Sequence, residues 1–349
     1  MTEIAKGVLG GGWSLVAGWI LPAAVNIALF GLFLLPDMRA FEPVDRLAQA
    51  ALSQQSLVLL TAAVVLGLLF SALQTPLYRV LEGYLGWPSW AFAWGRKRQQ
   101  RRLKLLRDRL DGLRLAQKES GGQLTSSEEG RLRELRADRR LAQKFAQDLF
   151  LIAPQRALLR ERLRRFPLRD EQVLPTRLGN ALRRMEQYGS DRYRLDSQVF
   201  WHELIAAAPE QTRQGVTTAR IGVDFFVCLL YGHLILAATA VTVQATKSGF
   251  SISLSALAVV LTAFAVIWYR LAVSSTEEWA MAIRALVNLG RKPLAEAMGL
   301  ELPATLHDER EMWSLLSKLS RLGYHENAAA LDRFRAGEGE THSRERPAE

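Results

Sequence analysis

Five polar side chains in one apolar stretch of the sequence are the first candidates for chemistry. At helical spacing they share one stripe of the stretch at about 221–245: Asp224, Cys228, Tyr231, Thr239 and Thr242. Polar groups inside a bilayer cost free energy and tend to face a helix bundle or a water-filled cavity. The stripe could therefore line an ion pathway, but small and hydroxylated residues are also common at plain helix–helix contacts. We favour packing and keep a pore as the alternative.

Four charged residues lie near the ends of such stretches. Asp224 begins the third apolar stretch and Arg270 ends the fourth. Because these helices would run antiparallel across a short loop, the two charges are expected to meet in a salt bridge, which lowers the cost of burying each one. The alternative is that the two charges form a gate or an ion-selective ring in an oligomer. Arg79 and Glu82, three residues apart after the second stretch, are expected to reach the membrane interface.

Two further polar residues, Asn26 and His233, fall near the middle of their stretches at a helical rise of about 1.5 Å per residue. We expect them to hydrogen-bond to each other. A midplane histidine could relay protons, yet a lone histidine without a carboxylate at its own depth is more often a satisfied buried group. Pro22, one turn before Asn26, is expected to kink the first helix.

The sequence carries no motif that marks a catalytic or metal centre. It has no glycine-rich phosphate loop, no HExxH, no G-x-S-x-G and a single cysteine, Cys228. The neighbours His202 and Glu203, and the run from His307 to Glu309, are interpreted as structural. We therefore predict a non-enzymatic protein without a cofactor or a bound metal.

Four apolar stretches must position these side chains. They lie at about 13–35, 56–76, 221–245 and 251–273. Each is close to the roughly 20 residues that a helix needs to cross the hydrocarbon core. A backbone in lipid must satisfy its own hydrogen bonds, which makes each stretch helical. The expected fold class is all-α: a polytopic membrane protein with four transmembrane helices in two hairpins and a cytoplasmic helical domain.

The distribution of lysine and arginine predicts the orientation. Segment 96–220 holds 29 of them against 16 Asp and Glu, and 274–349 holds ten, whereas the loops after the first and third stretches hold Arg39, Arg46 and Lys247. The positive-inside rule then puts both termini and the middle segment in the cytoplasm. Arginine outnumbers lysine 37 to 8 beside abundant alanine, leucine and glycine, which suggests a GC-rich bacterial genome. We predict a multi-pass protein of the bacterial inner (cytoplasmic) membrane.

The chain is expected to divide into five parts. These are a first transmembrane hairpin (1–94), a cytoplasmic helical domain (95–220), a second transmembrane hairpin (221–273), cytoplasmic C-terminal helices (274–336) and a tail (337–349). The tail is polar and lacks apolar anchors, so we expect it to be disordered.

Within the cytoplasmic domain the sequence predicts an antiparallel helical hairpin. Leucines every three or four residues indicate a helix over 95–120, which the pair Gly121–Gly122 ends. Ser126 and Glu129 are expected to form a capping box for a second helix that runs to about Leu149.

Helices are also expected on both sides of the second transmembrane hairpin. One should run from about Glu210 straight into the third apolar stretch. After the fourth stretch the helix should end at Gly290 and Pro293, and a last helix should span about 306–322.

An irregular stretch of the cytoplasmic domain carries a distinctive motif. It reads Leu-Pro-Thr-Arg-Leu-Gly-Asn at 174–180, with Arg192-Tyr193-x-Leu-Asp196 and Trp201 downstream and Pro303-Ala-Thr and Glu311-x-Trp313 near the C-terminus. Thr176 and Asp196 could each cap a following helix, and Gly179 would let another backbone approach closely. In these motifs the chain resembles a group of uncharacterised four-span bacterial membrane proteins. The resemblance implies this architecture and no activity.

The expected function is coupling between the cytoplasmic domain and the spans, in a homo-oligomer that could form a channel. The alternative is a non-conducting scaffold that docks a cytoplasmic protein partner, for which the candidate surface residues are Arg177, Asn180, Arg192, Asp196 and Trp201. The lipid bilayer is the other expected partner. Nucleic acid is not an expected partner, because the positive-inside rule already accounts for the basic excess of the middle segment.

Overall fold

The computed structural model describes residues 12–38, 42–49, 51–141, 151–247, 249–322 and 326–335. These residues fold into helices without a strand, apart from one isolated bridge between Leu300 and Arg335. The prediction of an all-α polytopic membrane protein is confirmed, since four helices are long and apolar enough to cross a membrane. The chain forms two compact units, one of residues 1–184 with 218–277 and one of residues 185–217 with 278–349.

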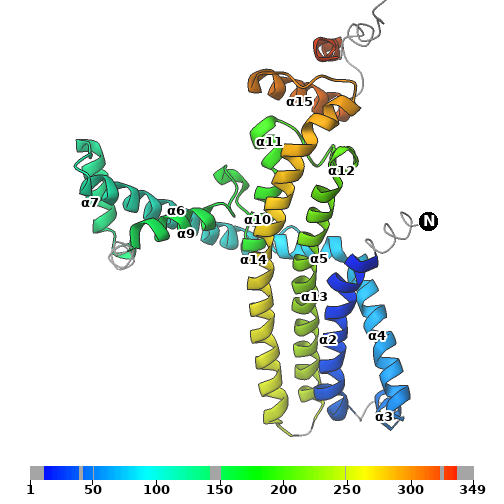
Figure 1. The fold of residues 1–349 in the computed structure, drawn as a ribbon. Helices are drawn as coiled ribbons and strands as arrows, with labels where there is room; N and C mark the ends of the chain where they lie inside the picture. The colour runs from blue at the N-terminus through cyan, green and yellow to red at the C-terminus, as the bar shows by residue number, and fades with distance from the viewer. Residues whose placement is uncertain are drawn as a thin grey trace, which may run out of the picture. The chain divides into compact units, whose positions relative to one another are not determined.

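The four candidate spans coincide with the predicted stretches. The first helix covers Gly12–Met38 and alternates π-helical segments, Val16–Ile20 and Phe30–Leu34, with α2 at Leu21–Leu29 and a last 3-10 turn at Leu35–Met38. The others are α4 (Leu52–Ala72), α13 (Glu210–Thr246) and α14 (Ile252–Ala297). The spanning parts of these helices lie side by side (Figure 1). Two short helices, α3 (Glu42–Gln49) and α5 (Gln74–Glu82), flank α4.

Glycines set the spacing of the bundle. A Cβ added to Gly67 of α4 would lie 2.8 Å from the Ile20 Cα, so the first two spans touch backbone to backbone there. A Cβ at Gly232 would lie 2.1 Å from the Asn26 side chain. Lipid tails are as apolar as leucine, so spans gain little from burying apolar side chains and associate through close packing at small residues.

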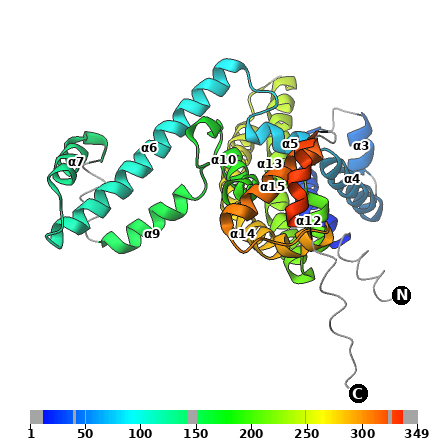
Figure 2. The ribbon, with the colours of Figure 1, turned by 90° about the horizontal axis from the view of Figure 1, so that it is seen from above.

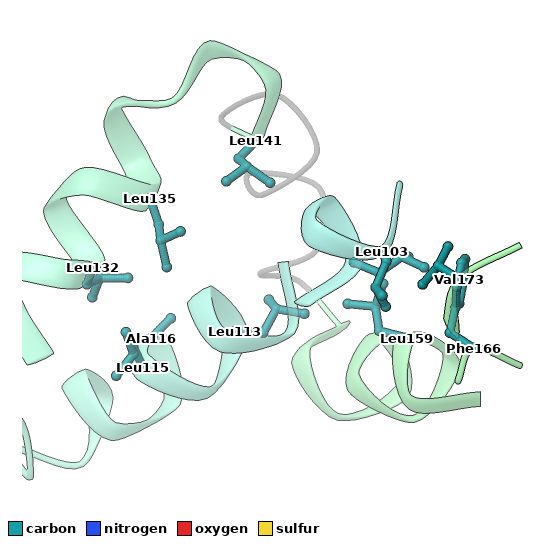
Figure 3. Close-up of a cluster of buried hydrophobic side chains, with 11 residues drawn as sticks. Leu103, Leu113, Leu115, Ala116, Leu132, Leu135, Leu141, Leu159, Phe166 and Val173 are labelled. Carbon is teal, nitrogen blue, oxygen red and sulfur yellow. The ribbon is translucent and has the colours of Figure 1, made fainter. Parts of the chain in front are cut away.

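Two helices lie where the antiparallel hairpin was predicted, but the second one, α7 (Ser126–Ala137), ends well before Leu149, because Asp138 is extended. Helix α6 (Ser89–Ser120) packs against α7 and α9 (Ile152–Leu163), and α9 runs back along α6 (Figure 2). Near the C-terminal end of α6, the Arg156 guanidinium donates to the Gln117 side chain. Near the middle of α6, Arg107 pairs with Asp170, with 2.8 Å between Nη1 and Oδ1. A cluster of buried leucines with Phe166 and Val173 fills the space between the helices (Figure 3).

The cap of α7 differs by one residue from the prediction. Thr125, not Ser126, is the N-cap: its hydroxyl accepts from the Glu128 N–H at 3.4 Å, and the Glu128 carboxylate accepts from the Thr125 N–H at 3.2 Å. Both Ser126–Glu129 and Thr125–Glu128 satisfy the capping-box spacing. In the structure Leu132 and Leu135 of α7 lie in the hairpin core.

The corrected cap carries a prediction. Thr125→Ala should raise hydrogen exchange across Ser126–Ala137 by the equivalent of about 1 kcal/mol, because an N-terminal amide of α7 loses its acceptor. Ser126→Ala should change exchange little. The measurement is hydrogen exchange of both variants in the full chain, and a larger effect for Ser126→Ala would restore the original register.

Further helices connect the hairpin to the last two spans. They are a 3-10 turn (Asp170–Gln172), α10 (Arg177–Glu186), α11 (Tyr188–Tyr193) and α12 (Trp201–Ala207), and the C-terminal part adds α15 (Leu306–Arg321) and a 3-10 helix (Glu326–Phe334). The predictions of a helix from Glu210 into the third span and of a last helix near 306–322 are confirmed.

The predicted end of α14 was wrong. The helix continues through Gly290 and Pro293 to Ala297. Gly290 is a site of close packing, because a Cβ there would lie 2.9 Å from the Leu204 side chain of α12. Leu294 and Ala295, directly after the proline, are fully buried, and this burial outweighs the hydrogen bond that Pro293 cannot donate. Outside the described residues lie Arg39, the predicted end of the hairpin at 142–149 and the tail at 337–349.

Candidate functional site

Asp224 is a buried carboxylate with two partners in the first unit. The Tyr78 hydroxyl donates to its Oδ1 at 2.6 Å, and the Arg220 Nε lies 3.5 Å from its Oδ2. The predicted Asp224–Arg270 salt bridge was wrong: Arg220, one turn earlier on α13, supplies the charge instead. The i,i+4 spacing of Arg220 and Asp224 was a usable signal for this pair. Tyr78 could not be found this way, because it is 146 residues away in sequence.

The rest of the polar stripe also makes contacts within the chain. Cys228 donates from Sγ to the Trp19 carbonyl at 3.4 Å, and the Tyr231 hydroxyl donates to the Leu77 carbonyl at 2.8 Å. The hydroxyls of Thr239 and Thr242 donate to carbonyls one turn back on their own helix, at Ile235 and Ala238. The polar atoms of all five residues are therefore engaged within this chain, and those of Asp224, Cys228 and Tyr231 bond to other helices.

Asn26 and His233 do not bond to each other as predicted. Asn26 donates from Nδ2 to the Pro22 carbonyl at 2.9 Å, and the His233 Nδ1 lies 2.9 Å from the Leu229 carbonyl. Each side chain thus uses the acceptor one turn back on its own helix, which needs no alignment between helices. Arg79 is exposed on α5, and Glu82 is half-buried beside it.

Residues 174–180 form a tightly packed joint against α5 and α6. The Pro175 ring lies against two glycines: an added Cβ would come within 2.2 Å of it from Gly83 and within 2.7 Å from Gly95. Gly83 also has a φ of +99°, a conformation that glycine adopts without strain. The close approach predicted for Gly179 is confirmed, since a Cβ there would lie 2.5 Å from the Glu82 carbonyl oxygen.

Hydrogen bonds fix the shape of this joint. Asn180 is almost fully buried; its Oδ1 accepts from the Leu174 N–H at 2.8 Å, and its Nδ2 donates to the carbonyls of Leu174 and Thr176 at 3.0 and 2.6 Å. The predicted cap is confirmed: the Thr176 hydroxyl accepts from the Gly179 N–H at 2.9 Å. The side chain of Asn180 is therefore structural and is not available to a partner.

Tyr269 connects the joint to the fourth span. Its hydroxyl accepts from the backbone N–H groups of Arg177 and Leu178, at 3.2 and 3.4 Å, in the first turn of α10. These amides have no partner within their own helix. Residues 174–180 are thus held by α5, which follows the second span, and by a side chain near the end of the apolar part of α14.

An arginine pocket opens beside the joint. Its guanidinium groups come from four separate segments of the first unit: Arg102, Arg162, Arg165, Arg177 and Arg270. Asn180 and Tyr269 also line it, and the cavity measures about 100 Å³. Sequence analysis singled out Arg177 and Arg270 separately and missed the other three arginines, because no local spacing brings α6, α9, α10 and α14 together.

Positive charge in this arginine pocket is poorly compensated. Arg165 pairs with Glu161 at 2.8 Å and with Glu277 at 3.6 Å, and among the described residues it is the only one of the five arginines with an ion pair. Burial, together with repulsion from Arg177 and Arg162, lowers the pKa of Arg102 from its ordinary value to about 10. Arg102 stays protonated at neutral pH, so the pocket holds a net positive charge.

The second unit has a polar network of its own. Glu309 is buried, lies 2.5 Å from the Arg291 Nη1 and accepts from the Trp313 Nε1 at 3.2 Å, while the Arg291 guanidinium stacks over the Tyr193 ring at 4.4 Å. Each charge here has a partner. This network stabilises the packing of α11, α14 and α15 and leaves no charge for a ligand.

The remaining predicted docking residues also belong to the second unit. Asp196 accepts from the Gln198 N–H at 3.1 Å and pairs with Arg321, Arg192 donates to the Tyr193 hydroxyl at 3.2 Å, and Trp201 is half-buried at the start of α12.

Three side chains at the start of α15 have metal-ligand chemistry and lie within 4.8 Å of one another: His307, Asp308 and Glu311. Asp308 bonds to the Thr305 hydroxyl at 2.7 Å, and Glu311 pairs with Arg333 at 2.6 Å, as expected for a helix start.

No family model, no curated protein and no solved structure matches this chain. The joint and the arginine pocket are the observations from which a function can be inferred.

Proposed function

We propose that this is a non-enzymatic protein of the bacterial inner membrane whose cytoplasmic helices sense a ligand or partner and transmit the change to the spans. The single observation that carries the proposal is the joint. Residues 174–180 contact α5, and α5 in turn holds Asp224 of the third span through Tyr78. The same residues contact the fourth span through Tyr269. A movement of the joint would therefore act on the second, third and fourth spans together.

The orientation in this proposal rests on charge. The segments expected in the cytoplasm carry 29 and ten Lys and Arg, far more than the two loops on the other side. The arginine-rich composition supports a bacterial source, and the motif at 174–180 supports membership of the uncharacterised four-span group.

Conduction through a homo-oligomer would be a further activity of the same protein, and the polar stripe gives it little support. Asp224, Cys228 and Tyr231 contact other helices of their own chain. An ion pathway would have to be lined by other residues. Ion flux in liposomes, with native mass spectrometry of the purified protein, tests this part: flux from an oligomer would support a channel, and a non-conducting monomer would exclude it.

Hydrogen exchange in nanodiscs tests the coupling. Tyr269→Phe removes the acceptor for two amides, so peptides over 174–182 should exchange about fivefold faster, the equivalent of ~1 kcal/mol. If the joint couples the domain to the spans, peptides over 74–82 and 220–228 should also change, because they contain Tyr78 and Asp224.

A loosened helix elsewhere provides the control. Thr125→Ala should alter exchange in α7 and leave the spans unchanged. Changes in Tyr269→Phe that stay within 174–182 would contradict coupling, and they would favour the alternative of a membrane-tethered scaffold for a cytoplasmic protein.

A further inference from the structure

We propose that the arginine pocket is a binding site for a phosphate monoester group or free phosphate. The inference names a ligand class for the cytoplasmic side of the protein, and it stands whether or not binding is coupled to the spans.

Charge is the first reason. Five guanidinium groups line the pocket, and among the described residues only Arg165 has carboxylate partners. Bringing like charges together and partly burying them is unfavourable, as the lowered pKa of Arg102 reflects. A folded protein gains nothing in stability from such an arrangement by itself. A bound anion would remove the repulsion and supply the missing partner.

The donor set is the second reason. Guanidinium groups bind phosphate oxygens with two parallel N–H donors, in a geometry that lysine cannot provide. The Tyr269 hydroxyl accepts two backbone N–H bonds from α10, which leaves its own proton to be donated. The first amides of α10 already bond to Tyr269 and Thr176, so this helix contributes only the dipole of its N-terminus.

The size and position of the arginine pocket restrict the class of ligand that it can bind. A cavity of about 100 Å³ admits a tetrahedral anion and leaves no room for a nucleoside attached to it inside the pocket. Arg102 and Arg165 are half-buried, while Arg162, Arg177 and Arg270 are exposed, so the group could enter from one side. Tyr269 and Arg270 lie near the end of the apolar part of α14. The phosphate could therefore be free in solution or be the headgroup of a phosphatidic acid molecule.

Phosphate binding to the purified full-length protein tests the site. In nanodiscs of phosphatidylcholine, inorganic phosphate should raise the melting temperature above that seen with chloride at equal ionic strength. The double variant Arg102→Gln, Arg162→Gln should bind phosphate at least about 10-fold more weakly, because it loses two charge-assisted donors. Without phosphate the variant should be as stable as the wild type or more so, since it also loses the repulsion.

A control with the same change in net charge is available on the hairpin. Arg133 and Arg139 are exposed and form no ion pair within the described residues, so Arg133→Gln, Arg139→Gln should leave phosphate binding within about twofold of the wild type. If the two double variants lost the same affinity for phosphate, the effect would be one of net charge alone, and the proposal of a site would be overturned. A variant of Arg102 and Arg162 that is less stable without phosphate and binds phosphate normally would assign these arginines a structural role instead.

The two sources of phosphate are separated by the lipid. Nanodiscs that contain phosphatidic acid should weaken the response to inorganic phosphate if the headgroup occupies the pocket, and the response should be unchanged if the natural ligand is soluble. Either result supports the shared chemistry. Absence of a response to both inorganic phosphate and phosphatidic acid would overturn the proposal and leave the coupling through the joint untouched.

Discussion

Gly179→Ala should destabilise the first unit by about 2–3 kcal/mol, in spite of the better helix propensity of alanine. A Cβ at this position would lie 2.5 Å from the Glu82 carbonyl oxygen and 2.9 Å from the Thr176 hydroxyl. The first of these atoms belongs to the backbone of α5, which cannot move without disturbing Tyr78 and its bond to Asp224. The joint must therefore open, and thermal unfolding in nanodiscs should measure the loss.

A second helical glycine provides the matched control. Gly215 lies in α13, and a Cβ there would meet no atom within 4 Å. Gly215→Ala should be neutral or stabilise the protein by up to about 1 kcal/mol, because only helix propensity changes. If the two substitutions had the same effect, the joint would be looser than the described contacts imply, and movement of residues 174–180 would no longer have to displace α5.

The elements of this fold could be predicted because their signals are local. About twenty apolar residues in a row specify a span regardless of what surrounds them, and the leucines of α6 indicate a buried face by their own spacing. Thr176 and Gly179 were identified for the same reason, since capping and close approach depend on residue type at one position.

The local rules failed where tertiary packing competes with them. Gly290 and Pro293 are helix-ending residues by type, yet α14 continues through them because the following turn is buried against its own unit. At α7 two overlapping cap registers satisfy the same motif, and residue type alone does not distinguish them.

The candidate site could be predicted only in part, because its residues come from distant segments. Asp224 was recognised as a buried charge, but its partner Tyr78 is 146 positions away. The arginine pocket combines α6, α9, α10 and α14, and in a chain with 37 arginines no pattern distinguishes these five from the rest. A cluster of arginines with fewer carboxylates than guanidinium groups becomes visible only once the helices are placed together.

The buried side-chain amide of Asn180 also holds the joint together. Asn180→Leu should cost about 3–4 kcal/mol, because it leaves the N–H and carbonyl of Leu174 without their side-chain partner and removes a bond to Thr176. Leucine has the same branched side-chain skeleton as asparagine and bulkier end groups, so no cavity forms and the loss should come from the unpaired polar groups together with the added bulk. Thermal unfolding in nanodiscs measures it, and the melting transition should fall for the first unit.

Asn288 in the second unit provides a control for Asn180, because its side-chain amide is exposed whereas that of Asn180 is buried. The Asn288 Oδ1 accepts from the hydroxyls of Tyr188 and Tyr193 at 3.1 and 3.0 Å, but the residue is exposed and water can replace it. Asn288→Leu should therefore cost less than about 1 kcal/mol. A larger loss for Asn288→Leu than for Asn180→Leu would mean that residues 174–180 keep their shape without the Asn180 bonds. In that case Pro175 and the glycines it contacts would hold the joint by packing alone, and Gly179→Ala would become the more damaging change of the two.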